Sequence, residues 1–239
     1  MKNFITPLSV VFLFVSCNVS FNGDSLSGNG NIKKETRNVG NFKAIKSSGS
    51  IDIEISSGDT YSVSVEDDEN ILPVIVTDVD NGTLNIHYKN NTSINNDHAK
   101  VYIKAPSLEK IISSGSANIS ITDAIKNNHE IEIGISGSGN IEGGVDAPKI
   151  SASIGGSGNM DLKGRTKDFE ARVSGSGDLE CGNLQSENTT VRVSGSGNAH
   201  VFASVHLTAS VSGSGNVRYR GNPSSPEIHS SGSGSVEPE

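Results

Sequence analysis

Three carboxylates are the side chains best spaced to do chemistry. Glu142, Asp161 and Glu180 each stand five residues after the first glycine of a Gly-Ser-Gly motif. If these motifs stack as parallel strands, neighbouring carboxylates would lie about 5 Å apart. Like charges at that spacing repel unless a cation or a base lies between them. The pattern therefore suggests a weak cation site or an acid pair for glycoside cleavage. The simpler interpretation, which we favour, is a solvated face with no catalytic or metal-binding residue.

The glycine-rich motif itself could be taken for a phosphate-binding loop. One copy lies in residues 191–201, VRVSGSGNAHV. A phosphate loop needs a helix after the glycines, and a strand pattern follows every copy here. Calcium-binding β-rolls repeat G-G-x-G-x-D, and Met160 stands where residues 155–161 would need the aspartate. We therefore expect neither nucleotide nor other cofactor.

Cys17 is the candidate for lipidation. Residues 4–15 are mostly apolar and too few to span a bilayer, as in a signal peptide. A small residue, Ser16, precedes the cysteine as in a bacterial lipobox, although Phe14 replaces the usual leucine. We expect a signal peptide over residues 1–16 and a tether over residues 17–27. Asn18 resembles the sorting signal of outer-membrane lipoproteins. The alternative is an ordinary signal peptide with a coincidental cysteine.

The remaining reactive residue types do not form a recognisable site. Cys181 falls in an apolar column and is expected to pack as a small hydrophobe. With Cys17 acylated no disulfide can form, and two cysteines cannot make a structural zinc site. The six histidines show no metal spacing, and no serine stands out as the nucleophile of a triad. A net charge of −8 argues against nucleic-acid binding.

The elements that would position these residues are strands of a repeat. From Gly115 onward the motif recurs with a period near 19 residues, which indicates a solenoid with one coil per repeat. Around each motif apolar and polar residues alternate, as in strands. We predict an all-β fold, a β-helix or β-roll of stacked parallel coils. The glycines expected at its sharp corners are Gly137, Gly139, Gly156, Gly158, Gly175, Gly177, Gly195, Gly197, Gly213 and Gly215.

The alternation continues through each corner. The two glycines would therefore point inward, where a tight corner leaves no room for a side chain. The serine after the first glycine, and the Asn or Asp two residues later, would point outward and form a ladder along one edge. The ladder is structural if these side chains satisfy backbone groups. Otherwise it is a flat polar surface for glycans or a partner protein.

The N-terminal part is less regular. We divide the mature chain into an irregular β part, residues 28–112, and a repetitive solenoid, residues 113–239. Asn81-Gly82 predicts a hairpin turn. Residues 69–79 are ambiguous because Pro73 disfavours a long helix, and residues 90–98 are expected to be a polar loop. A separate N-terminal subdomain is the alternative.

Three segments and the serial SGSGN motifs together resemble one family. The segments are FKAIKSSGSIDIEI at residues 42–55, DNGTLNIHY at residues 80–88 and APSLEKIISSGSANISI at residues 105–121. In this order they are similar to the putative auto-transporter adhesin, head GIN domain family of Bacteroidetes-type lipoproteins. The resemblance implies a pectin-lyase-like superhelix without catalytic residues and a role in cell adhesion.

The sequence thus favours a non-enzymatic lipoprotein of the cell envelope, anchored in the outer membrane and presenting a repetitive surface for adhesion or ligand binding. The expected partners are the membrane, through the anchor, and a glycan or surface protein. Self-association through the solenoid ends is a further expectation, because open ends expose strand edges. The rival classes are a polysaccharide-acting β-helix enzyme and a purely structural or regulatory envelope protein.

Overall fold

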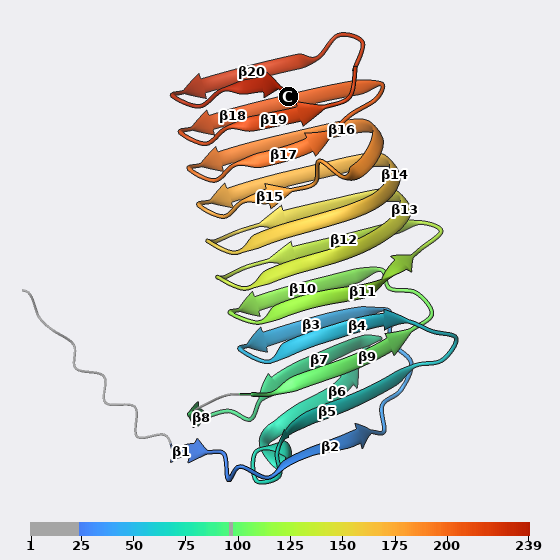
Figure 1. Ribbon diagram of the computed structural model, residues 1–239, viewed down its shortest axis with the longest axis vertical. Coiled ribbons are helices and arrows are strands. Elements are labelled where there is room, and N and C mark those ends of the chain that lie inside the picture. The colour runs from blue at the N-terminus through green and yellow to red at the C-terminus, as the bar shows by residue number, and fades with distance from the viewer. Residues whose placement is uncertain (1–23, 96–97) are drawn as a thin grey trace, which may run out of the picture.

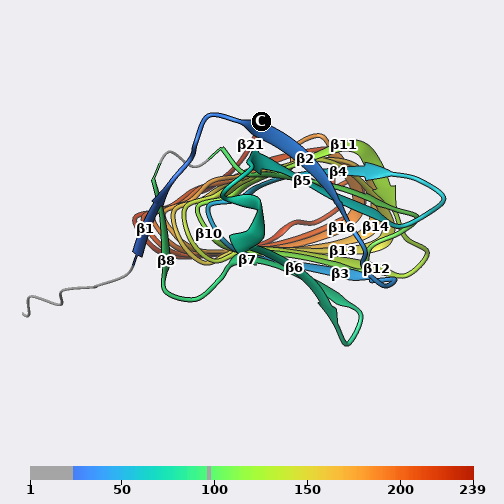
Figure 2. The same cartoon turned by 90° about the horizontal axis from the view of Figure 1, so that it is seen from below.

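The protein is a β-solenoid, as predicted. The computed structural model describes residues 24–95 and 98–239. These residues contain no α-helix, and their strands stack into a solenoid of about six turns. Figure 1 shows the stack from the side, with the N-terminal strands at the bottom and the last coil at the top. Seen along the stack, each coil is a flattened loop with two strand layers and two narrow edges (Figure 2).

The strands fall into two layers joined at the glycine corners. The layer that enters the corners contains β7 (Thr83–Tyr88), β3 (Ala44–Gly49), β10 (Lys110–Gly115), β12 (Glu130–Ile135), β18 (His206–Gly213) and β20 (Glu227–Gly232). The layer that leaves them contains β9 (Lys100–Ala105), β4 (Asp52–Ser57), β11 (Asn118–Lys126), β15 (Leu179–Glu180), β17 (Ala199–Phe202), β19 (Val217–Arg220) and β21 (Val236–Pro238). At the opposite edge, which we call the far edge, strands β13 (Asn140–Ile154) and β14 (Asn159–Gly175) bend from one layer into the other without a break, and β16 (Leu184–Gly195) begins there.

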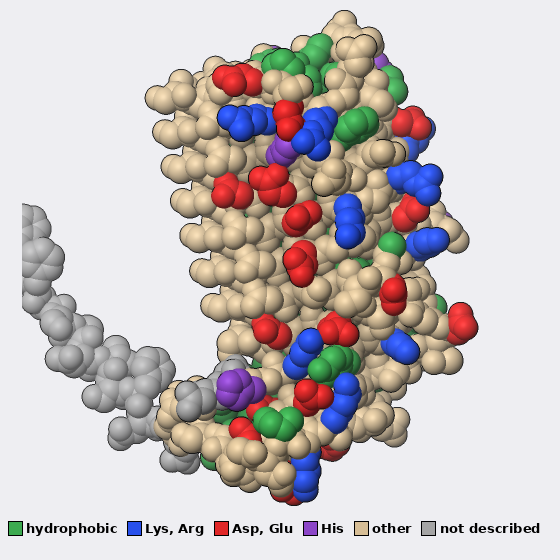
Figure 3. All heavy atoms as spheres, in the orientation of Figure 1, with side chains coloured by type: hydrophobic (Ala, Val, Ile, Leu, Met, Phe, Trp, Pro, Cys, Tyr) green, Lys and Arg blue, Asp and Glu red, His purple; other side chains and the backbone are tan. Residues whose placement is uncertain are grey.

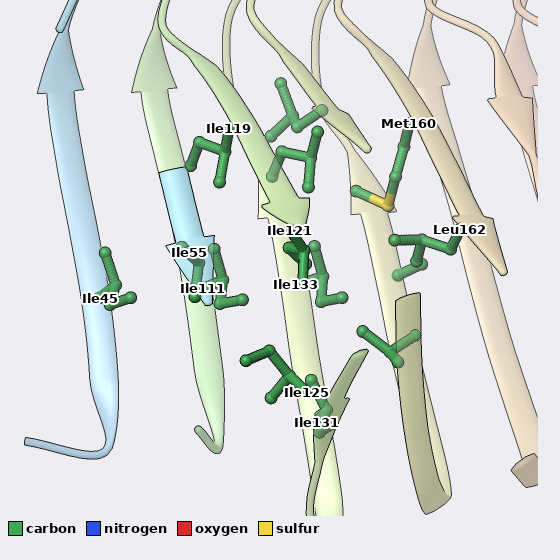
Figure 4. Packing of buried hydrophobic residues seen from close by; sticks show 14 of the residues in the cluster. Ile45, Ile55, Ile111, Ile119, Ile121, Ile125, Ile131, Ile133, Met160 and Leu162 are labelled. Carbon is green, nitrogen blue, oxygen red and sulfur yellow. The ribbon is translucent and has the colours of Figure 1, made fainter. Parts of the chain in front are cut away.

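The apolar columns predicted from the repeat lie in the core and run from coil to coil. Adjacent coils pair in parallel and in register, so that Ile141 lies beside Met160 and Ile154 beside Val173. The columns are rich in β-branched residues, which favour strands. Buried residues alternate with less buried ones along the long strands β14 and β16. Figure 4 shows these side chains filling the space between the two layers. One cluster of buried hydrophobic residues runs from Phe42 to Val217.

The glycine corners confirm the predicted alternation of inward and outward residues. They also show what a side chain would collide with at these positions. From Gly137 to Gly215, the second glycine of each motif is buried and the first is half-buried. A Cβ on Gly139 or Gly197 would come well under 3 Å from a main-chain oxygen of the preceding coil. The added atom would therefore collide first with the backbone of the preceding coil, along the stacking axis, and at Gly197 also with Val173 Cγ1 of the core, 2.9 Å away. Many first glycines also have positive φ, for example 138° at Gly195, which other residues rarely adopt.

The N-terminal strands do not stack in sequence order. Gly49 pairs with Gly115, so the coil made of β3 and β4 lies directly below β10 and β11. The later strands β7 and β9 lie beneath that coil in turn. Residues between the two glycines thus form an insertion that closes this end of the solenoid. Across that end, β2 (Ile32–Arg37) runs antiparallel to β5 (Ser62–Asp68), and β5 runs antiparallel to β9.

Local predictions for the N-terminal part are confirmed at the hairpin and wrong in the loop. Strands β6 (Ile75–Asp80) and β7 pair antiparallel around Asn81 and Gly82, which both have positive φ. The ambiguous stretch begins with a single 3-10 turn, η1 (Leu72–Val74), before β6. The expected polar loop contains β8 (Thr92–Asn95). It pairs with β1 (Asp24–Ser27), which lies in the expected tether.

Two buried serines interrupt an apolar column. Ser47 and Ser113 are neighbours in register, at 0% and 1% relative exposure, two residues before Gly49 and Gly115. Neither hydroxyl has a hydrogen-bond partner. The corresponding positions of later coils carry Ile135, Ile154 and Val173. Since an unpaired buried hydroxyl is costly, this pair of serines lowers the stability of the fold relative to the apolar residues of the later coils.

Candidate functional site

The polar ladder at the glycine corners is a chain of hydrogen bonds. The side-chain amide of Asn159 donates to Asn140 Oδ1 over 3.0 Å, and Asn159 Oδ1 accepts the backbone N–H of Asp178 at 3.2 Å. The same pattern continues from coil to coil, from Asp52 at one end to Ser235 at the other. The ladder therefore satisfies backbone donors of the corner, which is the structural interpretation of the motif.

The backbone groups of the corners are also hydrogen-bonded between coils. From Gly115 to Gly213, the carbonyl of the first glycine accepts two N–H groups from the next coil, as Gly175 does from Ser196 at 2.9 Å and from Gly197 at 3.0 Å. The serine hydroxyls of this edge point to solvent. Figure 3 shows the edge as a series of regular ridges almost without charged side chains. Its amides and backbone groups are engaged in holding the coils together.

The predicted carboxylate column forms, but its members do not converge. Glu142 pairs in register with Asp161, and Asp161 with Glu180, all on the outer face of one layer. Glu142 accepts a hydrogen bond from Ser120, and Glu180 faces His200. Among the described residues, no group of three or more His, Cys, Asp or Glu could hold a metal ion. Cation binding at this column stays a prediction.

A charged cluster continues this column toward the last coil. The imidazole of His200 lies between two carboxylates, with Nδ1 3.2 Å from Glu180 Oε2 and Nε2 against Glu239. Only a protonated imidazole can donate from both nitrogens. Arg220 donates to both Glu239 oxygens, over 2.6 and 2.7 Å. Hydrogen bonds from Arg220, and secondarily from His200, lower the pKa of Glu239 to about 2.

This cluster borders a polar hollow of about 550 Å³ between the ladder and the charged column. One side of it carries Glu180, His200, Arg218 and Glu237 in register, and the other carries the ladder residues Asp178, Asn198, Asn216 and Ser235. Sequence reasoning treated His200 only as a solvated neighbour and did not single out Arg220 or Glu239. The available signal was their place in the repeat, because His200 pairs with Arg218 and Phe202 with Arg220.

Cys181 is buried and unreactive, as its column predicted. Its side chain has 0% relative exposure. Burial raises the pKa of the thiol well above its usual range, so the thiolate that a nucleophile requires does not form. Cys17, the predicted lipidation site, lies outside the described residues. Within residues 24–95 and 98–239, no helix has the length and apolar character needed to cross a membrane.

Comparisons with solved structures place the fold among bacterial adhesin-like proteins. A putative adhesin from Bacteroides fragilis is 20% identical and superposes with a TM-score of 0.84, covering 90% of this chain and all of that one. A putative adhesin from Parabacteroides distasonis is 26% identical, with a TM-score of 0.72 and coverage of 90% and 100%. A putative lipid binding protein from the same species is also 26% identical, with a TM-score of 0.75 and the same coverage.

No curated protein matches the chain. The family described as putative auto-transporter adhesin, head GIN domain, matches residues 41–223. This range includes the insertion at the N-terminal end and nearly all the regular coils. Membership fits a non-enzymatic adhesion role at the cell surface or envelope. The chain belongs to the putative auto-transporter adhesin, head GIN domain family.

Proposed function

We propose that this protein is a lipid-anchored adhesin of the outer membrane, which binds its ligand without catalysing a reaction on it. The observation that carries the proposal is the continuous hydrogen-bonded stack from β7 and β9 to β20 and β21. Such a stack holds outward side chains at fixed positions on a long surface, which is what extended solenoid binding surfaces require.

The anchor in this proposal is Cys17. Two or three acyl chains on one residue give stable membrane attachment, whereas one chain does not. A short segment then separates the anchor from β1 at Asp24. In Figure 1, β1 lies at the N-terminal end of the stack, so the remaining coils would extend away from the anchor.

The geometry of the carboxylates supports binding over glycoside cleavage. A glycosidase places its two carboxyl groups on either side of the scissile bond. Glu142, Asp161 and Glu180 instead follow one another along a single exposed strand face. Lipid binding, suggested by one similar structure, has less support. Large exposed hydrophobic residues in the described ranges are limited to Ile32, Val205 and Ile228, which lie on different coils.

The test is adherence of bacteria that make the full-length chain. A host strain without the gene, a strain with the wild-type chain and a strain with Cys17→Ser are compared on surfaces coated with mucin or with matrix proteins. We expect the wild-type strain to adhere and Cys17→Ser to lose both adherence and outer-membrane fractionation. Ser16→Ala, which keeps a small residue before the cysteine, is the matched control and should behave as wild type.

Equal adherence of all strains on every surface would contradict the adhesin proposal. It would favour a structural or regulatory role in the envelope instead. Normal adherence of Cys17→Ser would contradict the anchor alone.

A further inference from the structure

The far edge of the solenoid contains a groove that the repeat does not explain. It has a volume of about 700 Å³ and is lined by residues of five successive turns of chain. Since coils are about 4.8 Å apart, it runs for roughly 19 Å along the stack. Figure 3 shows Lys, Arg, Asp and Glu side chains gathered toward this edge, on the right, in contrast to the glycine corners. We call this feature the far-edge groove.

The groove forms because two outward columns diverge around a bend with a small floor. Asp146, Arg165 and Gln185 pair in register and make one wall. Pro148, Lys167 and Glu187 make the other. The floor between them consists of Ala147, Thr166 and Ser186, which are at most 9% exposed. Short floor residues and diverging walls leave a trough that follows the axis of the stack.

The floor is rigid because its hydroxyl groups are engaged. Thr166 Oγ1 donates to the carbonyl of Asp168 over 3.0 Å. Ser186 is hydrogen-bonded to Thr189 and to the carbonyl of Phe202. The strands β13 and β14 continue through the bend and pair in register on both sides of Pro148 and Lys167. A ligand would therefore meet a preorganised surface, which lowers the entropic cost of binding.

The walls, in contrast, are not engaged. Within the described part of the chain, the following wall side chains take part in no hydrogen bond or ion pair: Asn128, Asp146, Arg165, Lys167, Gln185 and Glu187. Elsewhere on the surface, charged side chains commonly pair across coils, as Lys149 does with Glu130 at 3.0 Å. The far-edge groove thus combines a fixed backbone with free donors and acceptors.

We propose that the far-edge groove binds a neutral oligosaccharide. Its two acidic and two basic side chains balance, so it suits neither a polyanion nor a polycation. Planar amide, carboxylate and guanidinium groups can each bind two neighbouring hydroxyls of a sugar ring. The half-buried ring of Phe202 offers an apolar surface beside them. A protein partner would need a central apolar anchor region, which this groove lacks.

The inference rests on the proposed function, since both assign ligand binding to the outer surface of the solenoid. The test uses the purified full-length chain in detergent micelles and a fixed panel of neutral hexasaccharides: cellohexaose, maltohexaose, xylohexaose, mannohexaose and chitohexaose. Binding is measured by calorimetry for wild type, for Arg165→Ala/Gln185→Ala, and for Arg172→Ala as a matched control. Arg172 is exposed on a strand face outside the groove.

We expect at least one hexasaccharide to bind, and the double variant to weaken it about tenfold or more through the lost hydrogen bonds. Arg172→Ala should bind within twofold of wild type, and all three proteins should have the same unfolding midpoint. No binding by any member of the panel at millimolar concentration would overturn the inference. So would equal binding by the double variant, or binding confined to heparin or to protein ligands.

The two proposals can fail separately. If cells adhere normally but the purified chain binds no hexasaccharide, the groove proposal is wrong and the adhesin proposal stands. If the purified chain binds a hexasaccharide through Arg165 and Gln185 but cells never adhere, the adhesin proposal is wrong and the groove proposal stands.

Discussion

The two edges of the solenoid are made by the same coils and differ in almost every other respect. At the glycine corners, the coils repeat nearly the same five residues, SGSGN, and amides and carbonyls are bound to the neighbouring coil. At the far edge, residues change from coil to coil, and the wall side chains of the groove have no partners. The glycine corners thus have a uniform sequence and hydrogen-bonded polar groups. The far edge has a varied sequence and a groove whose wall side chains are unpaired in the described residues.

The difference follows from how each edge turns. A sharp corner breaks the strand, so its backbone groups need bonds between coils and its glycines lie too close to the next coil for any Cβ. At the far edge, β13 and β14 bend gradually and stay paired on both sides of the bend. The hydroxyl groups of the groove floor bond to backbone carbonyls there, as Thr166 and Ser186 do. The side chains of the groove walls are not used in this way, which leaves them available for binding. Repetition in this sequence therefore marks structure, and variation marks the candidate for function.

Gly197→Ala should have the largest effect on stability. The new Cβ would meet the carbonyl oxygen of Gly177 well under 3 Å away, so one coil must separate from the next. We expect a loss of about 3 kcal/mol or more in the free energy of unfolding, measured in urea. Gly155→Ala is the matched control, because its Cβ would lie 3.6 Å from the nearest atom, an ordinary contact. Equal losses in both variants would show that crowding between coils is not what selects glycine.

Removing one rung of the ladder should cost less. Asn159→Ala deletes the donor to Asn140 and the acceptor for the N–H of Asp178. We expect a loss of about 1 kcal/mol in the free energy of unfolding. Asp161→Ala, on the outer face of the same coil, should change it by less than about 0.5 kcal/mol. Equal stability of the two variants in thermal and urea unfolding would show that the ladder does not stabilise the fold.

The structure also predicts a stabilising change at this edge. Asp178 interrupts the ladder, because a carboxylate cannot donate to Asn159 Oδ1 and only its backbone N–H does so. In Asp178→Asn, the new amide would supply the missing donor and still accept from Asn198. We expect a gain of about 0.5–1 kcal/mol, seen as a higher unfolding midpoint. A lower midpoint would mean that the negative charge of Asp178 has a structural role of its own.

The charged cluster between the edges should contribute least, and only within a pH window. The pKa of Glu239 is lowered to about 2 by Arg220 and His200, from a usual value of 4.5. A lowered pKa in the folded state stabilises the protein above pH 4.5, and this contribution is lost as the pH falls through about 2. Glu239→Gln should therefore melt slightly below wild type at pH 7, and the difference should shrink as the pH falls to 2. A difference that persists undiminished at pH 2, or grows at high salt, would exclude the ion pairs as its cause.

The features of the fold that depend on the repeat could be predicted from the sequence. Columns such as Ile154 and Val173 follow from a constant spacing and a period of two, so the solenoid and its buried faces could be anticipated. The stacking of Gly49 on Gly115 could not, because it requires an insertion to leave the sequential order. The strand β8 was missed for a related reason, since polar residues form it only by pairing with β1. Ser47 and Ser113 break an apolar pattern that the later coils keep.

The candidate sites, too, divide into one that follows from the repeat and one that does not. The alignment of Glu142, Asp161 and Glu180 was visible because they share one offset from the motif. The far-edge groove was invisible because the turns there differ in length and composition. Asp146, Arg165 and Gln185 share a column only through the strand register. Repeated positions are recognisable in the sequence, whereas a groove built from unlike residues is recognisable only in the folded structure.

The contrast between the edges is tested most directly by measuring oligosaccharide binding and unfolding on the same two variants of the full-length chain. Arg165→Ala/Gln185→Ala changes only the far edge, and Asn159→Ala changes only the glycine corners. Our account predicts that the first loses hexasaccharide binding with an unchanged unfolding midpoint, while the second keeps binding and unfolds at a lower midpoint. Loss of binding in folded Asn159→Ala, with normal binding by the double variant, would contradict it and move the functional surface to the corners.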